Sequence, residues 1–305
     1  MLTPRIKALH AIEIGVQNLS EAVKFYSEVW GLEQSYLGEG RAHFRAANEL
    51  TNVLIVHEQK KPGLINLKFS AADKYAVDCL QAVARAFGLD VPDPFTKGIG
   101  ANEEYGFCFR CPDGHNISIV TSCREWRAGV IDSSKPTKLS HVVLNTADID
   151  RQAAFFKDLL GFRLSDKTDV MEFLRCGADH HSVAVATGSR PSVNHISFEM
   201  DNFDGLMRAV GRLKAHGFNL EWGVGRHGPG NNIFAYFIDP SGFVVEYTTE
   251  MEIVDESCYL AKDAVYWRAF PMRPCRWGVA THLSKRIIDA FDGRLLIETE
   301  HNGQQ

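Results

Sequence analysis

The 305-residue sequence contains no apolar run near the roughly 20 residues that a membrane-spanning helix needs, and its first residues lack the apolar core of a secretion signal. Neither sign of charge is in large excess, because the net charge is only -5. The lysines and arginines are also dispersed along the sequence. Neither a nucleic-acid surface nor an anionic-membrane surface is indicated. The seven cysteines are odd in number and scattered, which predicts buried thiols rather than disulfides or a zinc site. We therefore expect a cytoplasmic protein that binds neither membranes nor nucleic acid.

An internal repeat organises the chain. An alternating strand pattern at 9–16 is followed by helical spacing at 21–30, which stops at Gly31. The same succession returns at 139–144 and 150–160 and stops at Gly161. In this alignment His10 matches His141. The two halves are therefore predicted to be copies of one unit.

Each half repeats the unit again. The segment 65–69 matches 194–198, both precede a helical pattern, and the turn at 111–114 matches the turn at 239–242. We predict an α+β fold of two tandem domains, each built from two βαβββ modules, the four modules being 8–57, 62–122, 139–187 and 193–250. The expected domains are 1–131 and 138–305, joined by a linker at 132–137. The tail after residue 250 is rich in aromatic residues, and we expect it to pack on the second domain and roof a substrate mouth.

Comparison of the two halves points to a metal site in the second domain. Glu246 stands in an otherwise apolar strand, and a buried carboxylate needs a partner or a metal. With His141 and His195 it forms a set whose counterparts in the first half are His10, Asn66 and Ser118. Two imidazoles and one carboxylate are the facial triad suited to non-haem Fe(II). Taken singly, each of the three also has an ordinary structural interpretation, as a strand histidine or an edge glutamate.

Two segments resemble a known family. The first runs through Gly225-Arg226-His227, Tyr236, the Asp-Pro-Ser-Gly-Phe turn at 239–243 and Glu246, and the second spans 173–184 with its adjacent histidines. Together with the repeat, they are similar to the type I extradiol dioxygenases of the vicinal oxygen chelate superfamily, over nearly the whole chain. The resemblance implies that the C-terminal domain, 138–305, is the catalytic iron-binding domain and that the N-terminal domain, 1–131, binds no metal.

The resemblance also implies roles for individual residues. His141, His195 and Glu246 match the iron ligands, His181 the acid/base histidine, and His227 and Tyr236 residues that hydrogen-bond substrate oxygens. Val143 and Phe173 match positions that line the ring pocket. Structural alternatives stay open: a polar loop for His181, a turn cap for His227, and core packing for Tyr236, Val143 and Phe173.

The implied activity is extradiol (meta) cleavage of a catechol-type diol with O₂, incorporating both oxygen atoms and giving a 2-hydroxymuconic semialdehyde-type product in aromatic catabolism. We expect Fe(II), or Mn(II) in its place, and a homo-oligomer. The alternatives are a metal-dependent glyoxalase-like lyase or isomerase, and a non-catalytic ligand-sequestering protein of the same fold. The loop at 228–230 departs from some relatives, which carry polar residues there that touch the substrate, so the ring-substituent pocket stays open. The sequence does not reveal the cleavage position.

Overall fold

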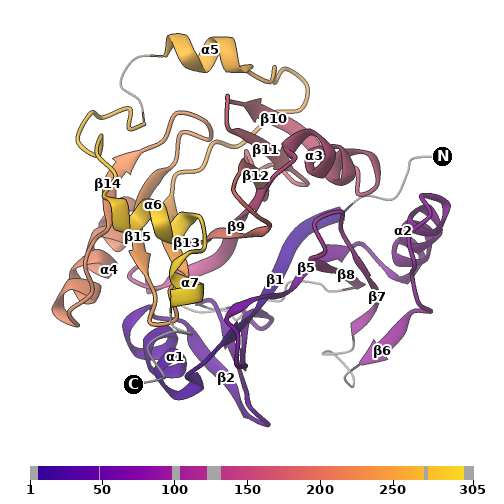
Figure 1. Cartoon of the computed structure of the whole chain (residues 1–305), viewed down its shortest axis with the longest axis horizontal. Helices are drawn as coiled ribbons and strands as arrows, with labels where there is room; N and C mark the ends of the chain where they lie inside the picture. Colours follow the sequence, from indigo (N-terminus) through magenta and orange to yellow (C-terminus); the bar gives the residue numbers. More distant parts are fainter. Residues whose placement is uncertain (1–5, 48, 98–103, 122–131, 271–273, 299–305) are drawn as a thin grey trace.

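The computed structural model describes residues 6–47, 49–97, 104–121, 132–270 and 274–298, which form two eight-stranded sheets, one from each half of the chain (Figure 1). The first sheet contains β1 (Ile6–Val16), β2 (Glu33–Gly38), β3 (Arg41–Arg45), β4 (Asn52–Glu58), β5 (Gly63–Ala71), β6 (Phe95–Lys97), β7 (Glu104–Arg110) and β8 (Asn116–Thr121). The second contains β9 (Pro136–Thr146), β10 (Arg163–Lys167), β11 (Met171–Arg175), β12 (Val183–Thr187), β13 (Ser192–Met200), β14 (Trp222–Arg226), β15 (Ile233–Ile238) and β16 (Val244–Thr249).

The two sheets have the same topology. Their strand orders are β2-β3-β4-β1-β5-β8-β7-β6 and β10-β11-β12-β9-β13-β16-β15-β14, so the first strands of two modules pair antiparallel at each centre. One helical segment follows the first strand of every module: α1 (Leu19–Lys24) with the π-helix η1 (Phe25–Val29), α2 (Lys74–Ala86), α3 (Ile149–Asp158) and α4 (Phe203–Ala215). This arrangement confirms the predicted fold of four βαβββ modules. The domain limits at 131 and 138 stay a prediction, and the expected linker at 132–137 overlaps the start of β9.

Helix boundaries follow local side-chain chemistry. Asn18 and Asp148 each accept a backbone N–H from the first helical turn, at 3.1 Å in both cases, which caps α1 and α3. The helix expected at 21–30 departs from the α form in its second half, where the Trp30 N–H donates to the Phe25 carbonyl at 2.7 Å. The tail adds α5 (Ala264–Ala269), α6 (Lys285–Phe291) and α7 (Leu295–Glu298).

The first helical segment of each half packs on its own sheet and also sends an aromatic side chain to the sheet of the other half. Trp30, which ends η1, stacks on Tyr247 of β16 with ring centroids 3.8 Å apart. Reciprocally, Phe156 of α3 meets Phe69 of β5 at 6.2 Å. These contacts join both halves into one hydrophobic core. The repeat gave no indication of these contacts between the halves.

Trp30→Ala is expected to lower the free energy of unfolding by about 3–5 kcal/mol, the usual cost of truncating a fully buried large aromatic. The Trp30 side chain is completely buried between Tyr247, Phe198 and Phe237. Urea titration followed by circular dichroism measures the change. Trp277→Ala serves as the matched control, because Trp277 is 41% exposed. Equal losses for the two variants would mean that Trp30 does not join the halves.

The first sheet carries an ionic network on the face that is equivalent to the face of His141, His195 and Glu246 in the second sheet. Lys68 Nζ lies 3.3 Å from Glu13 and 3.4 Å from Glu104, and the Asn66 amide donates to Glu13 and to Ser118. The strand register also corrects the alignment of the histidines. Ala11 lies opposite Lys68 as His141 lies opposite Ser197, and His10 falls in the bulge between Leu9 and Ala11. His10 was therefore matched one position out of register, and no ligand type stands at the true counterpart of His141.

The same network predicts acid sensitivity. Burial alone would raise the pKa of Glu13, but a hydrogen bond with His57 and the charge of Lys68 lower it to about 2. Glu104 behaves alike: against the effect of burial, His10 and Lys68 lower its pKa to about 2. A depressed folded-state pKa adds stability that is present above the unfolded value near 4.5 and is lost as the pH falls toward 2.

Unfolding stability is therefore expected to drop by on the order of 2 kcal/mol between pH 5 and pH 2.5 through this network. Glu13→Gln should weaken this dependence of stability on pH, whereas Glu58→Gln, at an exposed position, should leave it unchanged. Urea titrations at four pH values measure both. An unchanged slope in Glu13→Gln would contradict the assignment.

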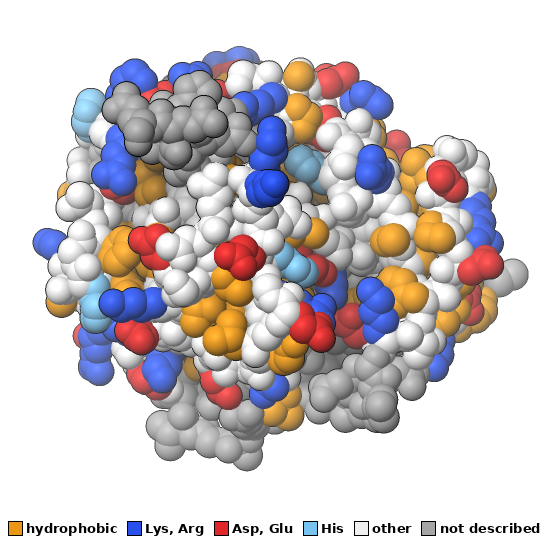
Figure 2. Space-filling view, turned by 60° about the horizontal axis from the view of Figure 1, so that its bottom comes forward, with side chains coloured by type: hydrophobic (Ala, Val, Ile, Leu, Met, Phe, Trp, Pro, Cys, Tyr) orange, Lys and Arg blue, Asp and Glu red, His pale blue; other side chains and the backbone are white. Residues whose placement is uncertain are grey.

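Cysteine placement differs partly from expectation. Cys111 and Cys275 are buried as predicted, but Cys108 and Cys258 are exposed because they stand on a strand face and in a tail turn that other segments leave uncovered. Cys123 lies outside the described residues. No described helix has the length and apolar character needed to cross a bilayer. On the face shown in Figure 2, acidic and basic side chains are interspersed, in keeping with the dispersed charge of the sequence.

Candidate metal centre

The middle strands of the second sheet bring His141, His195 and Glu246 together. His141 lies opposite Ser197 in the pairing of β9 with β13, and Ser197 lies opposite Glu246 in the pairing of β13 with β16. Residues directly opposite each other share a face of a sheet, and His195 shares the face of Ser197, two positions on. All three side chains therefore project to the same side.

Their donor atoms converge. His141 Nε2 is 3.0 Å and His195 Nε2 is 3.4 Å from Glu246 Oε2, and the two nitrogens are 3.3 Å apart. All three side chains are buried. The Nδ1 atoms have neighbours of their own, Asn194 Oδ1 at 2.8 Å from His195 and Ser140 Oγ at 3.3 Å from His141. Both rings are thus oriented with Nε2 toward the centre.

The donor set fits a divalent metal ion. Among the described residues, no donor reaches the buried Glu246 Oε2 with hydrogen-bond geometry. Burial would raise the pKa of Glu246, but His141 and His195 hold it well below its usual range, so the group is a carboxylate. Burial also lowers the pKa of His195, which favours the neutral, metal-binding imidazole. A cation at the meeting point would satisfy the orphaned oxygen and both nitrogens.

His227 and Tyr236 stand together beside this cluster. His227 follows β14, and its Nε2 lies 2.9 Å from the Tyr236 hydroxyl and 3.9 Å from Glu246 Oε1. Tyr236 is opposite Glu246 on β15, which puts it on the same face. Burial lowers the pKa of His227 to about 4, and burial together with Glu246 raises that of Tyr236 well above its usual value. Both side chains are therefore uncharged hydrogen-bonding groups at neutral pH.

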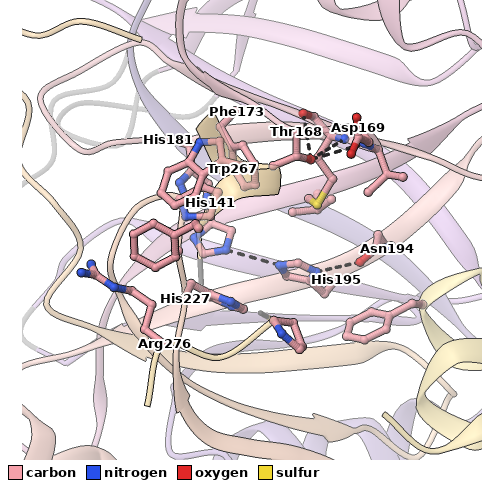
Figure 3. Close-up of a pocket in the computed structure, with 18 of the residues that line it drawn as sticks. His141, Thr168, Asp169, Phe173, His181, Asn194, His195, His227, Trp267 and Arg276 are labelled. Carbon is pink, nitrogen blue, oxygen red and sulfur yellow. Dashed lines mark hydrogen bonds between the residues drawn. The ribbon is translucent and has the colours of Figure 1, made fainter. Parts of the chain in front are cut away.

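His181 lies on the other side of the cluster, just before β12. Its ring is 4.3 Å from that of His141 and 5.1 Å from that of Phe173, between centroids (Figure 3). Burial first, and then the neighbouring histidines, lower the pKa of His181 well below that of a free imidazole. His181 is therefore neutral, able to accept a proton at one nitrogen and donate at the other.

These groups line one cavity of about 480 Å³. Its walls are mostly apolar and include Val143 and Phe173, which also pack with Ala184, Ala186 and Met171. Val143 and Phe173 therefore line the cavity and also belong to a small hydrophobic cluster, because their side chains lie between the sheet and the cavity. His141, His195 and His227 face the cavity from the sheet (Figure 3).

The tail completes the cavity with Trp267 and Phe270, two of the aromatic residues expected to roof the substrate mouth. It also adds four residues that the sequence pattern did not connect with the cavity: Arg268, Pro274, Arg276 and Phe291. Trp267 of α5 lies against Gly228, where an added Cβ would come within 2.8 Å of its ring. Gly228 therefore allows the tail to approach the loop after His227. The aromatic residues of the tail were the only signal in the sequence for this wall, and Thr168 and Asp169 in the β10–β11 turn gave none.

Comparisons with known proteins agree with this geometry. Residues 138–247 match the family model described as Glyoxalase/Bleomycin resistance protein/Dioxygenase superfamily. Metapyrocatechase 2 of Cupriavidus necator is 34% identical over 221 residues, covering 65% of this chain and 68% of that protein. Among solved structures, the Mn(II)-bound glyoxalase from Novosphingobium aromaticivorans has a TM-score of 0.86 and 33% identity, with 93% of this chain and 94% of that chain covered.

A more distant structure shares the fold. An extradiol ring-cleaving dioxygenase from B. fuscum has a TM-score of 0.78 at 20% identity, covering 86% of this chain and 76% of that one. The family match and the relative with 34% identity carry the assignment further than fold alone. The chain belongs to the Glyoxalase/Bleomycin resistance protein/Dioxygenase superfamily and, within it, groups with the extradiol dioxygenases.

Proposed function

We propose that this protein cleaves the ring of a catechol-type diol with O₂ at an extradiol position, giving a 2-hydroxymuconic semialdehyde-type product. The observation that carries the proposal is the buried His141, His195 and Glu246 cluster facing an apolar cavity. A cluster of this kind inside a ring-sized cavity suits a reaction in which substrate and oxidant meet out of contact with water. The names of curated relatives, including metapyrocatechase and biphenyl-2,3-diol 1,2-dioxygenase, support it.

The proposed cofactor is Fe(II), held by His141 and His195 through Nε2 and by Glu246 through its carboxylate. When bound, Fe(II) would supply a Lewis acid that lowers the pKa of the catechol hydroxyls and a redox couple that O₂ chemistry requires. Mn(II) suits the same donors, and one solved relative is described as Mn(II)-bound. Metal analysis of protein expressed in iron-rich and manganese-rich media decides between them.

The surrounding side chains have separate proposed tasks. His181 is the proton-transfer group, since it is neutral and lines the cavity next to His141. His227 and Tyr236 form a hydrogen-bonded pair that would orient a substrate oxygen from the opposite side. Val143 and Phe173 would hold the ring by apolar contact, while the tail residues Trp267 and Phe291 keep water out. With about 480 Å³, the cavity leaves room for a substituent on the diol.

The test is anaerobic reconstitution with Fe(II), followed by addition of O₂ with catechol, 3-methylcatechol or 2,3-dihydroxybiphenyl. We expect O₂ uptake in equal amount to the diol consumed, with a coloured ring-opened product. Light scattering on the same sample tests the expected homo-oligomer. Binding of the diols without O₂ uptake would instead favour a ligand-sequestering protein.

A glyoxalase-like lyase or isomerase is the second candidate. The observation that favours it is the 33% identity to a protein described as a glyoxalase over nearly the full chain. The paired His227 and Tyr236 with His181 opposite favour the dioxygenase, because a proton shuttle between two carbons needs no such hydrogen-bonding set around a diol. Conversion of the methylglyoxal–glutathione hemithioacetal without O₂ uptake on diols would overturn the first proposal.

A further inference from the structure

Two fully buried polar side chains beside His181 have no part in the mechanism described so far. They are Asp166 on β10 and His180, which precedes His181. His180 Nε2 lies 3.0 Å from Asp166 Oδ2, and His180 Nδ1 lies 3.0 Å from His181 Nδ1. The three side chains thus form a continuous hydrogen-bonded row. It begins inside the protein and ends at His181, in the cavity wall.

The tail fixes the first member of this row. The Lys262 backbone N–H donates to Asp166 Oδ1 at 2.8 Å, the Tyr259 hydroxyl lies 3.4 Å from the same oxygen, and the Lys167 N–H donates back to the Lys262 carbonyl at 2.9 Å. Asp166 Oδ1 is therefore committed to a backbone donor. Only Oδ2 is available to His180.

Proton positions follow from this order. A carboxylate only accepts, so the contact with Asp166 puts a proton on His180 Nε2. One proton lies between the two Nδ1 atoms of His180 and His181. Asp166 Oδ1 already has the Lys262 N–H and the Tyr259 hydroxyl as partners, and a neutral imidazole carries a proton on only one of its two nitrogens. His180 Nδ1 is then bare and accepts the N–H of His181 Nδ1.

We propose that Asp166 and His180 are positioning residues that hold His181 in the tautomer with its proton on Nδ1 and a bare Nε2 toward the cavity. The inference rests on the proposed function, in which a substrate hydroxyl gives a proton to His181. That proton would move to Nε2, leaving the hydroxyl oxygen negative and His181 cationic, and would return to a product oxygen later. Asp166 and His180 keep their own protonation states throughout.

Asp166→Asn reverses the row without changing its shape. The Lys262 N–H requires an acceptor, so the amide oxygen of the new side chain must face it and the NH₂ group must face His180 Nε2. His180 would then carry its proton on Nδ1 and donate to His181, whose proton would move to Nε2. The cavity would meet a donor where the wild-type protein presents an acceptor.

The tautomer can be read directly from ¹⁵N-histidine spectra of the full chain loaded with diamagnetic Zn(II), with His181→Gln used to assign the signals. We expect the proton of His181 on Nδ1 in the wild type and on Nε2 in Asp166→Asn. Asp179→Asn is the matched control, since Asp179 directly precedes His180 in the chain but forms an ion pair with Lys138. A wild-type proton on Nε2 would overturn the proposal even if Asp166→Asn failed to fold, and so would an unchanged tautomer in that variant.

Kinetics supply the second readout. For Asp166→Asn we expect kcat to fall roughly 10²–10⁴-fold, the range for loss of proton transfer, with KM for the diol and the iron content unchanged. A purely structural role would lower folded protein and iron content instead, and that result would refute the inference. If no diol is turned over by the wild type, the proposed function fails while the spectra still decide the tautomer.

Discussion

His195→Ala protein is expected to leave Fe(II) reconstitution without bound iron and without ring cleavage. Loss of the imidazole leaves only His141 and Glu246 at the centre, and a cation with two protein donors is held weakly. The affinity should fall by more than the roughly 10–100-fold seen when an outer partner of a ligand is removed. Elemental analysis after desalting measures the iron content, and O₂ uptake measures the activity.

His10→Ala is the control, because His10 is a buried histidine on the first sheet, where it falls in a bulge and lies 3.7 Å from Glu104. This variant should keep the wild-type iron content. If His195→Ala kept its iron and His10→Ala lost it, the metal would be bound by the first half of the chain and not by the second.

His181→Phe is expected to keep iron and near-normal diol affinity but to lose roughly 10²–10⁴-fold in turnover. Phenylalanine preserves the planar ring against Phe173 while removing both nitrogens. Stopped-flow measurement of turnover, together with anaerobic diol titration, separates the chemical step from binding. The exposed His216 on the end of α4 offers the control variant His216→Phe. Iron loss as large as in His195→Ala would make His181 a ligand, and unchanged turnover would make it a loop histidine.

The repeat carried most of the fold prediction. Matching strands, helix stops and turns located four modules, because a duplicated unit keeps its spacing wherever its backbone needs glycine. Gly114 and Gly242, at matching positions of the two turns, both have φ values near +90° (85° and 92°), which few other residues adopt. The same comparison singled out His141, His195 and Glu246. A side chain that only packs can be of the same type in both halves, whereas a ligand type present in one half alone indicates a function there.

Long-range packing was beyond the sequence pattern, whereas the register of the histidines was not. His10 falls in a bulge that β9 repeats at Ser140, so both halves keep the same register, and the offset of 130 between Gly31 and Gly161 already pairs Ala11 with His141. The hydrogen-bonded row that begins at Asp166 depends on the backbone N–H of Lys262, which lies 96 positions further along the chain. Likewise, nothing in the helical spacing of 21–30 indicates that Trp30 will stack on Tyr247 of the second sheet.

The stacking of Trp30 on Tyr247 has a consequence for how the molecule tolerates change. Glu246 lies on the face of β16 that carries the proposed metal centre, and its neighbour Tyr247 lies on the opposite face. The thickness of one strand therefore separates this centre from Trp30, a side chain of the first half. A substitution in that half can tilt β16 and shift the carboxylate without touching the cavity. The first half can therefore act on the proposed metal centre as a buttress for the strand that carries Glu246, although the residues that line the cavity all come from the second half.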